Sequence, residues 1–207
     1  MTRVKICGIK SHTEALLACR AGAWAIGEVF APSSRRIEAD RAAAINRELG
    51  GSVVKVGIFV DEKLDTMEYI IKTCGLDMVQ LHGQEPPELV AELPVPVIKC
   101  FPVKGPVDPD VVKRWRPWAY LFDTVVEGHS GGSGVSFNWD YLEAVLGWDN
   151  LILAGGLHAG NVAAAVKKIR PLAVDVSSGV EFAEGGKDPQ KVSRFINEVR
   201  EADKDVT

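Results

Sequence analysis

Aliphatic and β-branched residues gather in eight short runs along the chain, and stretches with amphipathic, helix-like patterning separate these runs. Most of the runs lack the alternation of polar and apolar residues that is typical of a sheet with one wet face. Continuous apolar runs are expected where helices cover one face of a parallel strand and a barrel core covers the other. The pattern predicts parallel strands at Val4–Cys7, Ala23–Phe30, Val53–Val60, Met78–His82, Val97–Phe101, Ala119–Asp123, Leu151–Ala154 and Ala173–Val176.

The stretches between the runs carry signals for the start and the end of helices. Ser11 and Glu14 have the spacing of a capping box. Asp108 and Asp188 each place a capping carboxylate before a proline at the first helical position. Residues that end a helix follow the periodic segments, namely Gly22, Gly50–Gly51, Gly75 and Pro171.

Strand and helix repeat eight times within 207 residues, which is near the lower size limit of one α/β barrel. The repeat favours a closed (β/α)8 TIM barrel over an open doubly wound sheet. We therefore predict a single TIM-barrel domain over residues 1–207. Its only loose end is the charged tail Glu201–Thr207.

Composition narrows the classes of function. The chain has 24 basic and 28 acidic residues, a net charge of −4, and these charges are spread along its length. Nucleic acid or an anionic membrane would need a basic surface, which this distribution does not provide. No apolar run approaches the roughly 20 residues that a membrane-spanning helix needs. We expect a small-molecule substrate and neither a nucleic-acid nor a membrane partner.

The cysteines predict a cytoplasmic protein with reduced thiols. All four lie far apart without paired spacing, and the chain starts without an apolar signal segment. Cys19 and Cys74 fall within helical stretches and Cys100 within a strand, so these three are interpreted as packing residues. Cys7 differs because it ends the first strand, where a thiol can face the mouth of a barrel.

Small-residue loops follow the last two predicted strands. Gly155 and Gly156 come after the seventh strand, and Ser177, Ser178 and Gly179 come after the eighth. The N–H groups of such loops can converge on a phosphate, and barrels often bind one at this position. The alternative is that both loops are only tight turns.

Charged residues at other strand ends are candidates for the chemistry. Asp123 ends an apolar strand, where a carboxylate must face water, a partner or a ligand, although capping the next turn is an alternative role. Asp175 lies inside its strand, and a functional role and a buried network role fit it equally. Arg35 and Arg36 follow the second strand, where a guanidinium could clamp a carboxylate or phosphate, and at least one of them fits a solvated surface position.

A histidine and a glycine-rich stretch complete the candidates at this rim. His82 ends the fourth predicted strand and fits a binding or a structural role. Gly128–Gly134 follows the sixth strand and could fold over a ligand, although the stretch also resembles a linker. No set of histidines and carboxylates has metal-ligand spacing, and no Ser-His-Asp elbow is present. The sequence therefore predicts no metal site.

Six short motifs run in order between Lys5 and Glu181, and as an ordered set they are specific where each alone is weak. They are Lys5–Gly8, Pro32–Arg36, Gln80–Gly83, Phe122–Thr124 with Gly131–Gly134, Gly155–Leu157 and Asp175–Glu181. Together they resemble the motif series of the phosphoribosylanthranilate isomerase family of tryptophan biosynthesis.

The resemblance implies a role for each matched residue. Cys7 is then the general base, Asp123 the general acid, and Arg36 contacts the anthranilate end of the substrate. The loops after the seventh and eighth strands hold the phosphate. Three further motif residues are assigned to substrate binding, namely Gln80, His82 and Asp175.

The reaction that the resemblance implies is an Amadori rearrangement, which turns an N-linked aminoaldose phosphate into a 1-amino-1-deoxyketose. It needs only proton transfers, so we expect no metal and no cofactor. A thiol with the ordinary pKa of about 8.5 is mostly protonated at neutral pH, so Cys7 would act through a minor or stabilised thiolate fraction. One residue departs from the family pattern: Glu28 stands where an aromatic residue is usual, which indicates an adjusted pocket or an inward pair with a basic group.

Two other functions are considered beside this one. The related isomerase of histidine biosynthesis, or a dual-substrate form, performs the same rearrangement on a two-phosphate substrate. It is expected to carry an aspartate where this chain has Cys7, and a second phosphate site. A non-catalytic phosphosugar-binding barrel is the other alternative, but it need not keep both Cys7 and Asp123. The oligomeric state stays open between monomer and homodimer.

Overall fold

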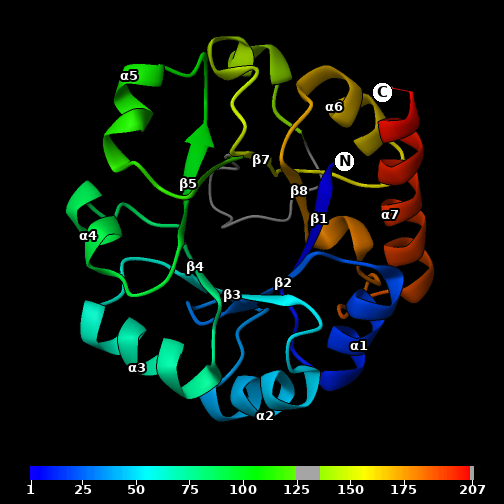
Figure 1. The fold of residues 1–207 in the computed structure, drawn as a ribbon. Helices are drawn as coiled ribbons and strands as arrows, with labels where there is room; N and C mark the ends of the chain where they lie inside the picture. The colour runs from blue at the N-terminus through cyan, green and yellow to red at the C-terminus, as the bar shows by residue number, and fades with distance from the viewer. Residues whose placement is uncertain (125–135, 206–207) are drawn as a thin grey trace.

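The strands follow one another around a closed barrel. The structure, a computed structural model, describes residues 1–124 and 136–205. Every neighbouring pair of strands is parallel, and β8 pairs with β1, so the predicted TIM barrel is confirmed (Figure 1). The strands are β1 (Arg3–Cys7), β2 (Ala25–Val29), β3 (Val54–Phe59), β4 (Met78–Leu81), β5 (Val97–Val103), β6 (Ala119–Thr124), β7 (Leu151–Leu153) and β8 (Ala173–Val176).

Helices cover the outside of the barrel (Figure 1). Between β6 and β7 the described residues form a 3-10 helix in place of the expected α-helix. The glycine-rich segment 128–134, which the sequence predicts to close over a ligand, lies outside the described residues. The helices are α1 (His12–Ala21), α2 (Ala39–Leu49), α3 (Leu64–Cys74), α4 (Pro87–Glu92), α5 (Pro109–Val112), η1 (Lys113–Trp115), η2 (Trp139–Val145), α6 (Val162–Ile169), η3 (Ser178–Val180) and α7 (Pro189–Lys204).

The predicted helix signals act as caps. The Ser11 side chain accepts from the backbone N–H of Glu14, whose carboxylate in turn accepts from the Ser11 N–H, which completes the capping box of α1. Asp188 caps α7 through the N–H groups of its first turn. That helix continues to Lys204, so the prediction of a loose end from Glu201 is wrong for the residues up to Lys204. The amphipathic pattern of the tail, which packs Ala202 inward, explains this.

The barrel has two apolar layers. One lies between the strands and the helices. The other fills the lumen with mostly small side chains. Polar groups occupy the lumen near the carboxyl ends of the strands. The lumen layer consists of Ala25, Val56, Met78, Ile98, Cys100, Ala119, Leu121, Ile152, Ala154 and Ala173.

Glu28 faces the helix layer and not the pocket. Its carboxylate accepts from Asn46 Nδ2 of α2 at 2.9 Å, and the same amide donates to the Cys74 carbonyl at the end of α3. The expectation of an adjusted pocket or an inward ion pair is therefore wrong. Burial raises the pKa of Glu28 from 4.5 to about 7, although Asn46 and Lys55 oppose the shift.

The buried carboxyl of Glu28 should make stability depend on pH. A folded-state pKa of about 7 against 4.5 means that the folded chain binds the extra proton, so the contribution of Glu28 to the free energy of unfolding is fully present below pH 4.5 and is lost as pH rises through 7. Glu28→Gln keeps the shape and removes the titration. Urea unfolding at pH 5 and pH 8 should show the wild type losing about 2–3 kcal/mol more than this variant. Glu68→Gln, on the exposed face of α3, is the control that should follow the wild type; equal pH slopes for Glu28→Gln and wild type would contradict the account.

Candidate active site

Two cavities lie at opposite ends of the barrel. The one at the carboxyl ends of the strands has a volume of about 300 Å³ and brings together most of the predicted site. Arg36 and Gly179 are predicted site residues that do not line it. The predicted residues that do line it are Cys7, Gln80, His82, Asp123, Gly155, Gly156, Asp175, Ser177 and Ser178.

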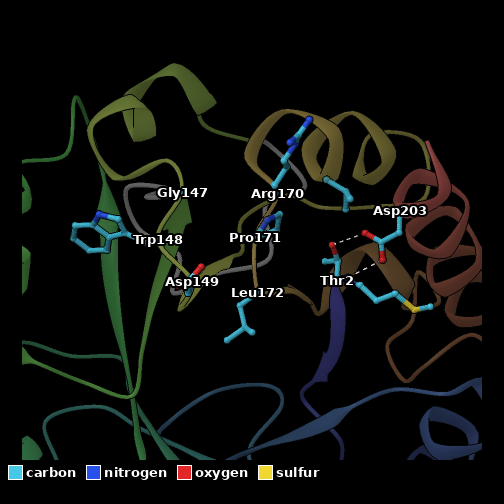
Figure 2. Close-up of a pocket in the computed structure, with 10 residues that line it drawn as sticks. Thr2, Gly147, Trp148, Asp149, Arg170, Pro171, Leu172 and Asp203 are labelled. Atoms are coloured by element: carbon cyan, nitrogen blue, oxygen red, sulfur yellow. Dashed lines mark hydrogen bonds between the residues drawn. The ribbon is translucent and has the colours of Figure 1, made fainter. Parts of the chain in front are cut away.

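The cavity at the amino-terminal ends is larger, about 460 Å³, but has different chemistry. Figure 2 shows Trp148 and Arg170 on its border, with Thr2 directed at Asp203 of α7. The backbone N–H and the hydroxyl of Thr2 donate to the Asp203 carboxylate at 2.7 and 2.8 Å, which ties the start of β1 to the last helix. TIM-barrel enzymes work at the opposite rim, so the smaller cavity is the candidate active site.

Cys7 is the last residue of β1 and lies in a space that a glycine provides. A Cβ atom on Gly27, its neighbour on β2, would stand 2.9 Å from the Cys7 Sγ, so only glycine leaves room for the thiol there. Burial raises the pKa of Cys7, and the carboxylate of Asp175 adds to this, whereas the ammonium groups of Lys5 and Lys187 lower it. The two lysines are therefore the groups that favour the thiolate.

A buried ion pair lies in the lumen below the thiol. Lys5 and Asp175 face each other across the β1–β8 register, and Lys5 Nζ stands 3.0 Å from Asp175 Oδ1. Burial works against the charge on Lys5, but Asp175 and then Cys7 outweigh it, so the pKa of Lys5 is raised. Asp175 thus points into the lumen, and its network role is present. A contact between Asp175 and the substrate stays a prediction.

Asp123 ends the apolar part of β6. It lines the same cavity as Cys7, which lies on β1. Burial raises the pKa of Asp123 from 3.8 to about 7, and the charge of Asp175 adds to the effect. The N–H of Thr124 and the charge of Lys5 oppose it. This carboxyl can therefore hold a proton at neutral pH, which an ordinary aspartate does not.

His82 stands beside Asp123. Its Nε2 lies 3.8 Å from Asp123 Oδ2 and 3.7 Å from the Sγ of Cys100, and its Nδ1 is 2.9 Å from Gln80 Nε2. Burial lowers the pKa of His82, so the ring is neutral at physiological pH. Cys100 is buried, as expected of a packing residue, and lies in the lumen layer. Its contact with a candidate site residue was not foreseen.

The loops after β7 and β8 line the same cavity. Gly155 and Gly156 have φ angles of 85° and 61°, and a Cβ on Gly155 would collide with the Thr124 backbone and side chain. Gly179 packs so closely against the Leu157 carbonyl that no other residue fits, which holds the two loops together. Gly179 therefore shapes the loops from behind the cavity wall.

Comparison with known proteins identifies the family. The family model described as N-(5'phosphoribosyl)anthranilate (PRA) isomerase matches residues 4–198. The chain belongs to this family of isomerases. The N-(5'-phosphoribosyl)anthranilate isomerase of Syntrophomonas wolfei is 57% identical over 201 residues, which are 97% of this chain and 98% of that protein.

Solved structures of the family share the whole fold. Phosphoribosyl anthranilate isomerase from Thermotoga maritima superposes with a TM-score of 0.89 at 37% identity, covering 97% of this chain and 100% of the other. A phosphoribosyl anthranilate isomerase in complex with reduced 1-(o-carboxyphenylamino)-1-deoxyribulose 5-phosphate has a TM-score of 0.85 at 36% identity, with coverage of 97% and 100%.

In this isomerase the structure separates the two arginines after β2. The Arg36 side chain is half exposed, and its Nε stands 3.4 Å from Glu38 at the surface. Arg35 lines the cavity instead, and its guanidinium donates to both carboxylate oxygens of Glu181 at 2.8 and 2.7 Å. Adjacent side chains on an irregular loop diverge, so sequence alone did not reveal which arginine faces inward.

Glu181 is the centre of an ionic network that sequence reasoning missed. Lys187 Nζ stands 2.7 Å from its carboxylate and donates to the Ser177 carbonyl at 3.3 Å. Burial works against the charge of Glu181, but Arg35 and Lys187 outweigh it and lower its pKa to about 2. The network joins the loop after β2 to the loop after β8, and so holds two sides of the cavity together. Lys5 was missed as well, although a charge inside an apolar strand, two residues before Cys7 and on the same face, was a readable signal.

Proposed function

We propose that the protein converts N-(5-phosphoribosyl)anthranilate to 1-(2-carboxyphenylamino)-1-deoxyribulose 5-phosphate, the Amadori rearrangement of tryptophan biosynthesis, with Cys7 as base and Asp123 as acid. One observation carries the assignment of roles. A thiol on β1 and a carboxyl on β6 line one cavity, which two small-residue loops line as well. The reaction needs such a pair of proton-transfer groups and a place for a phosphate.

The rearrangement then proceeds by proton transfers alone. Asp123 gives its proton to the ring oxygen of the furanose, and the C1–O bond breaks to leave a Schiff base between C1 and the nitrogen. Cys7 thiolate removes the proton from C2, the electron pair forms a C1–C2 double bond, and the nitrogen recovers its lone pair. The resulting enolamine takes up a proton from solvent at C1 and gives its C2 hydroxyl proton to solvent as it becomes the ketone. Cys7 then releases one proton and Asp123 regains one, which restores the enzyme. Protons balance, and no electron acceptor is needed.

Substrate anchoring is assigned to the loops of the cavity and to Arg36, which does not line the cavity but follows the cavity residue Arg35. The loops with Gly155–Gly156 and Ser177–Gly179 hold the phosphate, and Arg36 holds the carboxylate of the anthranilate. Arg36 pairs with Glu38 at an exposed site, where an ion pair is weak, so exchanging Glu38 for a ligand carboxylate costs little free energy. The relative crystallised with the reduced product supports a cavity that accepts this class of ligand. Gln80, His82 and Asp175, which line the cavity, are assigned to substrate binding.

We infer that the chain acts in the cytoplasm, as one domain over residues 1–207, on a free phosphosugar, without a nucleic-acid or membrane partner and with no cofactor. The net charge of −4 supports the absence of a nucleic-acid or membrane partner, because such partners would need a basic surface. None of the helices among the described residues has the length and apolar character needed to cross a membrane. Its state is a monomer or a homodimer, since the Thermotoga maritima relative is described as dimeric with monomers generated from it.

The experiment for the reaction is a fluorescence assay. Phosphoribosylanthranilate is fluorescent through its anthranilate ring, and purified protein should make this fluorescence decay enzymatically. Fluorescence that decays at the same rate with and without the protein would overturn the proposal and favour a barrel that only binds phosphosugars.

Activity should survive removal of metals. Exhaustive dialysis against a chelator should leave kcat and KM unchanged, because each proposed step moves only protons. Steady-state kinetics before and after dialysis check this. A loss of turnover that one divalent ion restores would show that a metal takes part.

A further inference from the structure

Three potential metal ligands converge from neighbouring strands on one side of the cavity. His82 follows β4, Cys100 lies on β5 between β4 and β6, and Asp123 ends β6. One ligand atom from each lies within 4.8 Å of the others. We propose that His82, Cys100 and Asp123 bind one Zn²⁺ ion, or a cation of the same kind, and that the bound ion inhibits the enzyme. The inhibition rests on the proposed role of Asp123, whereas the binding does not.

The distances fit a tetrahedral zinc site. Zinc bonds of about 2.3 Å to sulfur and about 2.0–2.2 Å to nitrogen and oxygen place the ligand atoms about 3.6 Å apart for S and N, and about 3.4 Å apart for N and O. Here Cys100 Sγ and His82 Nε2 are 3.7 Å apart, and His82 Nε2 and Asp123 Oδ2 are 3.8 Å apart. Shifts of a few tenths of an ångström therefore bring these two pairs to zinc spacing, and the Cys100 sulfur and an Asp123 oxygen already lie within 4.8 Å of each other.

The donor set selects the kind of ion. Thiolate, imidazole and carboxylate together suit zinc, whereas magnesium and calcium need six or more oxygen ligands. Cys100 and Asp123 supply two negative charges that neutralise the ion, and the thiol proton leaves to solvent when the metal binds. Three protein ligands leave the fourth position open toward the cavity, from which the ion enters.

Gln80 can hold the histidine in the form that binds metal. A metal-binding imidazole usually donates its other N–H to an oxygen. The Gln80 amide faces His82 Nδ1, and a half-turn of the amide exchanges its nitrogen for Oε1, which is buried and has no hydrogen-bond partner among the described residues. Oε1 then accepts from Nδ1–H, and the lone pair of Nε2 faces Cys100 and Asp123.

The ion would stop turnover by occupying the acid. An Asp123 carboxylate bound to Zn²⁺ has no proton to give to the ring oxygen. Cys7 is not part of the ligand set, so the base is untouched. The bound ion is thus expected to inhibit turnover, and the metal-free protein is the active form.

Cobalt is the probe for binding, because Co²⁺ replaces Zn²⁺ and a thiolate ligand gives a charge-transfer band in the near ultraviolet. Chelator-treated protein should take up one Co²⁺ with this band, and Zn²⁺ should displace it. Cys100→Ala, and Cys100→Ser if alanine disturbs the lumen, should lose the band. Cys7→Ser and the distant Cys19→Ala should keep it. A band that survives both Cys100 variants, or that disappears in Cys7→Ser, would overturn the site, as would no band at all.

Turnover is measured separately. Zn²⁺ should inhibit the wild type, and a chelator should restore it. Cys100→Ala should turn over at the wild-type rate without metal. It should need at least about tenfold more Zn²⁺ for half inhibition, because losing even a hydrogen bond to a metal ligand lowers metal affinity by about tenfold or more. Equal zinc sensitivity in both proteins would refute the inhibition. If no protein turns over phosphoribosylanthranilate, the proposed function fails while the cobalt spectra still decide on the site.

Discussion

Cys7→Ser should lower kcat by at least about 10²-fold while the protein still binds the product. A serine hydroxyl in the same place is far too weak a base to remove the C2 proton, and the Lys5 and Lys187 charges that favour a thiolate cannot ionise it. The exchange removes little volume, and Cys7 sits at the end of a strand with its Gly27 neighbour unchanged, so the fold should be intact.

Two measurements on this variant separate chemistry from binding. Steady-state kinetics give kcat, and titration calorimetry with reduced 1-(o-carboxyphenylamino)-1-deoxyribulose 5-phosphate gives Kd, which should stay within a few-fold of wild type. Cys19→Ser, a half-buried cysteine of α1, is the matched control and should be fully active. Turnover near the wild-type rate in Cys7→Ser would remove Cys7 from the role of base.

Asp123→Asn should lower kcat by about 10²–10⁴ with little change in KM. The amide keeps the size and hydrogen bonding of the carboxyl but cannot donate a proton to the ring oxygen. Arg36→Met should behave differently, because it removes a charge that holds the substrate carboxylate in both ground and transition states. Its KM should rise, and its kcat should fall less.

The contrast between the two variants is the test. If Asp123→Asn changes only KM, or Arg36→Met changes only kcat, the roles of the two residues are misassigned. Arg35→Met is the comparison variant for the second arginine. It breaks the pair with Glu181 that joins two loops of the cavity, so it should lower thermal stability, an effect that Arg36→Met should not share.

The strands could be predicted because a barrel buries them on both faces. Val97–Val103 and Ala173–Val176 are continuous apolar runs apart from one charged residue each. Lys99 lies on the face of β5 opposite to the lumen residues Ile98 and Cys100, and Asp175 faces the lumen. Caps such as Ser11 and Asp188 were predictable for a similar reason, since each acts within a few residues of itself. The 3-10 helix that stands in place of the expected α-helix among the described residues between β6 and β7 had no such local signal.

The candidate site was predictable as far as strand ends specify it. Cys7, His82 and Asp123 each end a predicted strand, and closure of the barrel alone brings such ends to one rim. Contacts between side chains were not predictable. Lys5 and Asp175 are 170 residues apart in sequence, and Cys100 meets His82 only through the register of β4 with β5. Glu28 was misplaced because neighbouring strand residues face opposite sides, and the register that decides the side is a property of the whole barrel.

The most direct measurement follows the sugar carbon that the reaction changes. Phosphoribosylanthranilate labelled with ¹³C at C2 of the ribose is mixed with chelator-treated protein and observed by NMR. The account predicts that the carbinol resonance of C2 is replaced by a ketone resonance with wild type, and much more slowly with Cys7→Ser or Asp123→Asn. A C2 resonance that stays a carbinol with wild type, or a ketone that forms as fast with both variants, would contradict it.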